Sequence, residues 1–362
     1  WPRTSASAAV AGRSAMGACC CCCINVNDYR TTAERRVDQA DELGAALASR
    51  VIVVTGAAGN LGAEMAAALY HGSATVVLAG RSMPRLDAVK TDIEKRYPGA
   101  PGRLVPMAVD LGDYESITSF AAACAAAFPD GVYCLINNAG MIPKKAFEAS
   151  KYGYETTFQT NYLGTFLLTE LLLPQLERAG PGARVVNVPT LSINEVAKPF
   201  PWDQVPRKAA NFGGYHVDYA ESKWLLVCYT AELHRRFTTL GGGLKAVCAD
   251  PGIVPGSSMW DQQTAVIRFF ARRVMYGFTK SAAQGAATAA WCATAPAAHL
   301  QSGRYYQSGK PGPNPRPDTD DPESWARLRE LTSQCVPQEL LHNAASGGST
   351  GANDTASVGN EQ

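Results

Sequence analysis

A tyrosine and a lysine four residues apart are the side chains in this sequence whose types and spacing best suit proton transfer. Tyr219 and Lys223 occur in the stretch YAESK, inside a segment, 217–237, that predicts a helix. Side chains at positions i and i+4 of a helix point to one face. An unperturbed tyrosine has a pKa of about 10, and a nearby ammonium group lowers it by stabilising the phenolate. The pair indicates a general acid or base, although two surface residues would give the same pattern.

A glycine-rich turn earlier in the chain could hold a phosphate. Val51–Val54 is an apolar, β-branched run that predicts a strand buried on both faces, and Ala63–Tyr70 predicts a helix. Between them, Gly56, Gly59 and Gly62 would let backbone N–H groups approach a pyrophosphate, whose charge the helix dipole favours. Taken alone, the same residues also fit an ordinary turn between a strand and a helix.

The residues after the second predicted strand bear on the choice of cofactor. An aspartate at this point would accept a hydrogen bond from a ribose 2′-hydroxyl and would repel a 2′-phosphate. This chain instead has Gly80 followed by Arg81, with Arg85 one turn later. A guanidinium binds phosphate through bidentate, charge-assisted hydrogen bonds. The sequence therefore favours NADP(H) over NAD(H).

Predicted strands and helices alternate along the chain between residues 50 and 310. Strands are expected at 51–54, 75–79, 104–109, 132–136, 184–188, 244–249 and 303–307, and helices at 63–70, 82–97, 114–128, 152–177 and 217–237. Alternation over this length requires right-handed crossovers and a parallel sheet. The expected fold class is therefore α/β, a doubly wound parallel sheet of about seven strands with helices on both faces.

Composition gives no sign of a nucleic-acid or membrane-spanning protein. The net charge of the 362 residues is +1, which indicates neither nucleic acid nor an anionic membrane as a partner. No apolar run reaches the roughly 18 residues of a membrane-spanning helix. Five of the eleven cysteines form the run Cys19–Cys23, and no pair has the spacing of a metal site or a disulfide framework. We expect no metal and a reducing intracellular compartment, the cytoplasm or an organelle such as a plastid.

Both ends of the chain differ in composition from its middle. Residues 1–49 are expected to be a variable, disordered leader, and their first 27 residues contain arginine but no acid, which also suits the end of a transit peptide. If translation began at Met16, Gly17–Cys23 could carry lipid anchors, and a low-complexity run is the alternative. Residues 337–362 are expected to be a low-complexity tail, and 311–321 an exposed loop.

Residues 50–336 resemble the short-chain dehydrogenase/reductase family. Five motifs occur in that family's order: TGAAGNLG (Thr55–Gly62), NNAG (Asn137–Gly140), the Asn161 of TNYLGTFLLT, YAESK (Tyr219–Lys223) and PGIV (Pro251–Val254). The resemblance implies a Rossmann fold and transfer of a hydride between a nicotinamide and a carbonyl or alcohol carbon. The cofactor chemistry is then the nicotinamide's own, and the protein supplies orientation and electrostatics.

The resemblance also assigns roles to single residues. Tyr219 would be the acid or base, Lys223 would tune it and hold the nicotinamide ribose, and Asn161 would relay protons through a water at a break in its helix. Thr190 stands where the family has a serine that holds the substrate carbonyl. The cofactor-binding residues carried over are Thr55, Gly56, Gly59, Asn60, Leu61, Gly62, Arg81, Asp110, Leu111, Asn138, Ala139, Gly140, Tyr219, Lys223, Pro251, Gly252, Ile253 and Val254.

Two departures from the family pattern leave alternatives open. Asn60 replaces a glycine of the common short motif, and asparagine is the residue other than glycine that best tolerates left-handed dihedrals. Pro189 and Thr190 replace a pair of serines, so Ser192 is a second candidate for holding the substrate oxygen. A catalytically weak, NADP(H)-binding regulator is therefore one alternative function.

The region around the expected site resembles the retinol dehydrogenase and protochlorophyllide reductase group. The likeness rests on a long insertion between Thr190 and Tyr219 and on the C-terminal run that includes SGRYYQSGK. It implies a small, lipophilic carbonyl or alcohol substrate, with reduction of a ring C=C bond as an alternative. Val266–Phe278 mixes aromatic and basic residues and predicts an amphipathic lid helix or a peripheral membrane contact. The sequence leaves the oligomeric state open.

Overall fold

The computed structural model describes residues 47–144, 146–254 and 280–345, and their centre is one sheet of eight strands. The strand order is β3-β2-β1-β4-β5-β6-β7-β8, and every neighbouring pair is parallel except the last. The strands are β1 (Val51–Thr55), β2 (Thr75–Gly80), β3 (Arg103–Ala108), β4 (Cys134–Asn137), β5 (Arg184–Asn187), β6 (Lys245–Asp250), β7 (Tyr305–Gln307) and β8 (Lys310–Gly312).

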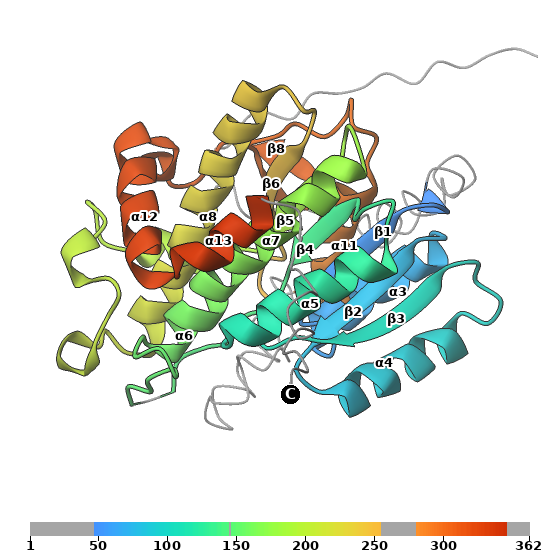
Figure 1. Cartoon of the computed structure of the whole chain (residues 1–362), viewed down its shortest axis with the longest axis horizontal. Helices are drawn as coiled ribbons and strands as arrows, with labels where there is room; N and C mark the ends of the chain where they lie inside the picture. Colours follow the sequence, from blue (N-terminus) through green and yellow to red (C-terminus); the bar gives the residue numbers. More distant parts are fainter. Residues whose placement is uncertain (1–46, 145, 255–279, 346–362) are drawn as a thin grey trace, which may run out of the picture.

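Helices cover both faces of the sheet, which confirms the expected doubly wound fold (Figure 1). On one face α3 (Asn60–His71) packs against α11 (Ala282–Thr294), and on the other lie α5 (Tyr114–Ala127), α7 (Gly164–Arg178) and α8 (Tyr215–Leu240). The central strands are buried on both faces, as continuous apolar runs in parallel sheets should be. The other longer helices within the described residues are α4 (Met83–Arg96), α12 (Pro322–Cys335) and α13 (Gln338–Ala345).

The eighth strand was not expected from the sequence. It pairs antiparallel with β7 through a two-residue turn, in which Gln307 is opposite Lys310. The turn residues Ser308 and Gly309 have φ values of 54° and 72°. Positive φ at both positions is what a tight hairpin of the favoured hand requires. The turn therefore adds one short antiparallel edge strand to an otherwise parallel sheet.

The long helix expected at 152–177 is three pieces in the structure. A single helical turn, α6 (Thr156–Phe158), leads into a π-helical turn, η1 (Gln159–Leu163), and then into α7. Glu155 caps α6, because its carboxylate accepts the backbone N–H groups of Thr157 and Phe158 at 2.8 and 2.9 Å. Asn161 lies inside η1. The break that the family resemblance implies at Asn161 is therefore present as a π-helical turn.

Two segments expected to be loop or tail are packed against the core instead. Helix α13 contacts α7, and its Leu340 and Leu341 lie against the core, so residues 338–345, within the stretch expected to be a tail, form a packed helix. In the stretch 311–321, Arg316 and Thr319 are buried rather than exposed. The leader residues 1–46, including Gly17–Cys23, and the lid predicted at Val266–Phe278 lie outside the described residues.

Within the described parts of the chain, no helix has the length and apolar character needed to cross a bilayer. Six cysteines fall in these parts, and all are buried free thiols: Cys124, Cys134, Cys228, Cys248, Cys292 and Cys335.

Candidate active site

The sequence motifs converge at the carboxyl ends of the central parallel strands. The glycine turn follows β1, the NNAG segment follows β4, Thr190 follows β5 and the PGIV segment follows β6. Strand β1 lies between β2 and β4, so the strand order changes direction there. Ligands of doubly wound sheets bind at this edge, beside such a switch point.

The glycine turn is closely packed against the NNAG segment. A Cβ atom at Gly62 would lie 2.4 Å from the Gly56 carbonyl oxygen, and one at Gly56, where φ is 66°, would lie 2.9 Å from the Ala139 Cα atom. The Asn138 side chain donates to the Thr55 carbonyl at 2.8 Å, and the Ala139 N–H donates to the Thr55 hydroxyl at 3.0 Å. Side chains at these glycines would therefore displace the backbone.

The start of helix α3 is suited to an anion. Its N-cap is Gly59, which has no side chain to cap the first turn, and that turn contains no acid. Asn60 is its first residue and is exposed, and Leu61 beside it is half-buried. The backbone N–H groups at an uncapped helix start carry partial positive charge and bind phosphate. The turn and helix start together fit the pyrophosphate of a dinucleotide.

Two arginines follow β2, and one of them contacts this turn. Arg81 is exposed, and the exposed Arg85 on α4 donates from Nη2 to the Ala58 carbonyl at 3.4 Å. After β3, the Asp110 carboxylate accepts the Gly112 N–H at 2.9 Å. These residues are at the ends of neighbouring strands, apart from the cluster around Lys223 described next. Their place fits the adenosine half of a dinucleotide.

Leu111 is buried beside the π-helical turn. A Cβ atom at Gly164 would lie 2.0 Å from the Leu111 carbonyl oxygen, so the backbone of α7 starts in direct contact with this segment. The segment after β3 therefore packs against the start of α7, directly after the π-helical turn that carries Asn161.

Three predicted site residues lie close together at the carboxyl ends of the central strands: Asn161, Lys223 and Gly140. The Asn161 amide accepts the Met141 N–H at 2.8 Å and donates to the Met141 carbonyl at 2.9 Å and to the Ser222 hydroxyl at 3.1 Å. A Cβ atom at Gly140 would lie 3.2 Å from Lys223 Nζ and 3.6 Å from Asn161 Oδ1. The structure therefore brings these predicted site residues together.

Lys223 is buried on α8, one turn after the half-buried Tyr219. Its ammonium donates to the Val188 carbonyl at 3.0 Å. Burial lowers the pKa of Lys223 to about 8, because the charged form loses solvation. The side chain is thus mostly protonated at neutral pH and carries a positive charge next to the predicted acid or base.

Two hydroxyls follow β5. The Thr190 hydroxyl accepts the Ser192 N–H at 3.4 Å and caps the short 3₁₀ helix η2 (Leu191–Glu195). The Ser192 hydroxyl oxygen is buried and has no hydrogen-bond partner among the described residues. Pro189, which replaces a serine of the family pattern, is buried. Both hydroxyls therefore remain candidates for holding a substrate oxygen.

The PGIV segment is held by its neighbours. The Asp250 carboxylate accepts the Gly252 N–H at 2.7 Å, and the Ile253 carbonyl accepts the Lys280 N–H at 2.8 Å. Pro251 and Val254 are buried, whereas Ile253 is exposed. The segment thus presents one apolar side chain outward at the end of β6.

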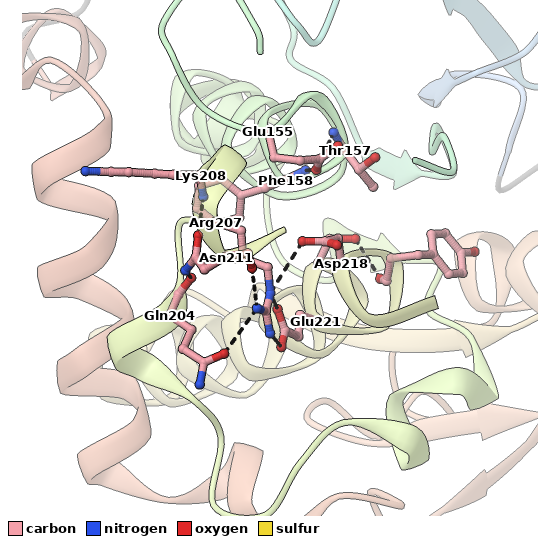
Figure 2. A network of polar contacts seen from close by, with 11 residues as sticks. Glu155, Thr157, Phe158, Gln204, Arg207, Lys208, Asn211, Asp218 and Glu221 are labelled. Atoms are coloured by element: carbon pink, nitrogen blue, oxygen red, sulfur yellow. Dashed lines mark hydrogen bonds and ion pairs between the residues drawn. The ribbon is translucent and has the colours of Figure 1, made fainter. Parts of the chain in front are cut away.

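A buried ionic network that includes Asp218, the residue before Tyr219 in the chain, was not anticipated from the sequence (Figure 2). The Arg207 guanidinium donates to both carboxylate oxygens of Glu221, at 2.8 and 2.6 Å, and also to the Asn211 carbonyl at 2.7 Å. Its Nε atom lies 3.4 Å from the Asp218 carboxylate. The network joins the insertion before α8 to the first turns of that helix. The only sequence signal was the two acids that flank Tyr219.

Asp218 has the most strongly shifted pKa in this network. Burial raises its pKa to about 7, and the charges of Glu155 and Glu221 act in the same direction, while Arg207 acts against them. Figure 2 shows the Asp218 side chain between Arg207 and the Glu155 cap of α6. Arg207 therefore pairs with two buried acids, Asp218 and Glu221, while a third buried acid, Glu155, acts on Asp218. Among the described residues, no cluster of His, Cys, Asp and Glu could hold a metal ion.

Comparison with known proteins identifies the family. Residues 50–198 match the family described as short chain dehydrogenase. Human retinol dehydrogenase 12 is 31% identical over 264 residues, which cover 73% of this chain and 79% of that protein. The chain belongs to the short-chain dehydrogenase/reductase family. Within this family of oxidoreductases it falls in the retinol dehydrogenase-like group.

Other proteins of known sequence or structure also match this short-chain dehydrogenase/reductase. Mouse polyprenol dehydrogenase is 29% identical over 305 residues, covering 83% of this chain and 85% of that protein. A crystal structure of a protein from Mycobacterium paratuberculosis matches with a TM-score of 0.61 and 26% identity, over 81% of this chain and 93% of that one. An NADPH-bound oxidoreductase from Pseudomonas aeruginosa, with a TM-score of 0.55 and 22% identity over 71% and 94% of the two chains, shares the fold.

Proposed function

We propose that this protein is an NADP(H)-dependent oxidoreductase that interconverts a lipophilic carbonyl compound and its alcohol. The observation that carries the proposal is the meeting of Gly140, Asn161 and Lys223 one helical turn from Tyr219. This cluster lies at the same sheet edge as the close-packed glycine turn and the uncapped start of α3. A bound nicotinamide would supply or accept the hydride at its C4 atom.

Tyr219 and Lys223 together would handle the proton. The Tyr219 hydroxyl gives a proton to the substrate oxygen during reduction and takes it back during oxidation. The Lys223 ammonium, fixed by its bond to the Val188 carbonyl, stabilises the phenolate form. Asn161 is held at both ends of its amide by Met141 and contacts Ser222, whose hydroxyl donates to the Tyr219 carbonyl at 2.8 Å. It therefore orders the helix that carries Tyr219, and at the π-helical break it would help to hold a water that relays protons toward solvent.

A hydroxyl from the turn after β5 would hold the substrate oxygen. We assign this role to Thr190, which occupies the place of the family serine, with Ser192 as the competing candidate. The Ser192 hydroxyl favours the second assignment because it is buried and has no partner among the described residues. Such a hydroxyl donates to the oxygen as negative charge develops on it.

Two further observations support the cofactor and the substrate class. Arg81 and Arg85 are exposed beside the glycine turn, where a guanidinium would bind a 2′-phosphate. The aromatic rings of Phe147 and Phe212, from the segments after Gly140 and before α8, meet edge to face at 5.9 Å. Apolar surface of this kind suits a lipophilic substrate. The retinol and polyprenol dehydrogenases among its relatives support the same class.

A screen of long-chain and ring-bearing aldehydes, ketones and alcohols with NADPH, NADP, NADH and NAD tests the proposal. We expect turnover with the phosphorylated cofactors, and we expect Tyr219→Phe to abolish it while NADPH affinity stays within about two-fold. Tyr97→Phe, a half-buried tyrosine at the end of α4, is the matched control and should keep full activity. NADPH binding without turnover of any compound would favour the regulator instead.

A further inference from the structure

Arg316 is completely buried, and all five of its N–H donors are engaged. Nη1 donates to the carbonyls of Ile193 and Val196 at 2.7 and 2.8 Å, and Nη2 donates to the Ala197 carbonyl at 3.2 Å. The Asp318 carboxylate accepts the other two, from Nε at 2.8 Å and from Nη2 at 2.6 Å. An arginine has no further donor to offer. Arg316 therefore cannot reach a ligand and can act only through the groups that it holds.

The three carbonyls belong to the turn that carries the candidate substrate-holding hydroxyls. Helix η2 starts directly after Thr190, contains Ser192, and leads into Val196 and Ala197. Before this turn, the Lys223 ammonium donates to the Val188 carbonyl at 3.0 Å. Buried cations thus hold the backbone on both sides of Thr190 and Ser192, and the first of these cations is the predicted catalytic lysine.

Arg316 also contacts the helix that carries Tyr219. Its guanidinium carbon lies 5.8 Å from the ring centroid of Trp224, the residue after Lys223. The Trp224 ring is stacked on Phe200 with centroids 4.0 Å apart, and Trp202 meets it at 5.6 Å. Arg316 therefore packs between the hydroxyl-bearing turn and the catalytic helix, next to aromatic residues of the insertion.

An apolar side chain could fill the buried position of Arg316, so packing alone does not explain a charged residue there. A buried charge is costly unless it is paired and fully hydrogen-bonded. Turn carbonyls can be satisfied by water at the surface, whereas a rigid guanidinium fork fixes several of them in one geometry. A lysine would keep the charge but lose that fixed geometry.

We propose that Arg316 is a positioning residue that fixes the turn 190–197, so that a hydroxyl of that turn faces the substrate oxygen. This inference rests on the proposed function, because it gives Arg316 a role in the same reaction. It extends the site to the segment between β8 and α12, which lies nearly a hundred residues after Lys223 in the chain.

Arg316→Lys in the full chain tests the inference, and Arg184→Lys is a matched control. Arg184 is also completely buried, and it donates to the carbonyls of Gly182, Cys292 and Ala295 at 2.8, 3.0 and 2.7 Å. It begins β5, so it lies at the sheet edge opposite the site. If Arg316→Lys does not fold, Arg316→Met combined with Asp318→Asn removes both charges and takes its place.

We expect kcat to fall at least ten-fold in Arg316→Lys, with NADPH affinity within two-fold of the unchanged protein. Arg184→Lys should lower the melting temperature and leave kcat unchanged. Of Thr190→Val and Ser192→Ala, the variant that lowers kcat should lower it no further when Arg316→Lys is added. The inference would be overturned if the two substitutions in the double variant lowered kcat independently, so that their fold-losses multiplied. It would also be overturned if Arg184→Lys lowered kcat as much as Arg316→Lys does. Either result would leave the proposed function standing.

Hydrogen–deuterium exchange gives a second measurement that needs no activity. Peptides that cover residues 188–197 should exchange faster in Arg316→Lys than in the unchanged protein, and at an unchanged rate in Arg184→Lys. If the unchanged protein turns over no substrate, the proposed function fails and this exchange measurement decides the structural part alone. Equal exchange of these peptides in all three proteins would overturn the inference.

Discussion

Replacing Asp218 with asparagine should flatten the dependence of this protein's stability on pH. Asp218 is only 4% exposed, and one of its carboxylate oxygens has no hydrogen-bond partner among the described residues. Burial, with the charges of Glu155 and Glu221, raises its pKa to about 7. An asparagine has nearly the same shape and stays neutral at every pH.

The expected magnitude follows from the difference between folded and unfolded chains. Asp218 keeps its proton in the folded state up to about pH 7, whereas in the unfolded chain it ionises near pH 3.9. Its contribution to stability is therefore full below pH 3.9 and is lost as the pH rises through 7. Between pH 5 and pH 8 this loss is about 2–3 kcal/mol, or roughly 5–10 °C in melting temperature. The pKa of Lys223, about 8, acts mainly above this range.

Urea unfolding at pH 5, 6, 7 and 8 measures the effect. Other groups also titrate in this range, so the informative quantity is the difference between the two proteins at each pH. Relative to the unchanged protein, Asp218→Asn should gain about 2–3 kcal/mol in unfolding free energy between pH 5 and pH 8. Asp87→Asn, an exposed site on α4, is the control and should follow the unchanged protein. Parallel curves for Asp218→Asn and the unchanged protein would refute the reasoning.

Two further predictions concern ligand recognition. NADPH should bind more tightly than NADH, and Arg81→Ala should weaken NADPH roughly ten- to hundred-fold, the value of one charge-assisted bond, with little change for NADH. Fluorescence titration measures both, and equal affinity of the unchanged protein for the two cofactors would contradict the prediction. If Thr190 holds the substrate oxygen, Thr190→Val should lower kcat by about 10²–10³ while Ser192→Ala has little effect. The reverse pattern would assign the role to Ser192.

Local patterns were enough to predict most of the fold. The β-branched run before Gly56 and the alternation of strand and helix patterns after it predicted the parallel strands, with bounds within a few residues of those observed. Such runs predict well because a strand buried on both faces must be apolar throughout. Strand β8 and the hairpin turn at Ser308 and Gly309 were missed, because a strand of three residues is too short to show an alternation of apolar and polar side chains.

The ionic contacts around the site could not be predicted from the sequence. Arg316 lies in a stretch rich in proline and aspartate that was expected to be exposed, and its carbonyl partners are about 120 residues away. Arg207 lies in the insertion, and nothing local indicates that it pairs with Glu221. Such pairs depend on how distant segments pack. Because charged residues are mostly exposed in proteins, a charged residue in a sequence is expected at the surface. The sequence therefore indicated the candidate reacting groups but not the groups that hold them.

The packing of the C-terminal helices has a consequence for how the protein is made. Every family motif ends before residue 255, yet the Thr332 hydroxyl on α12 lies 2.6 Å from the hydroxyl of Tyr162, the neighbour of Asn161. The Tyr114 hydroxyl likewise donates to the Cys335 carbonyl at 3.1 Å. A ribosome therefore completes all the candidate reacting groups some eighty residues before it synthesises the segment that packs against them. A product cut short near residue 310 would carry every motif and still lack the support on which the π-helical turn rests.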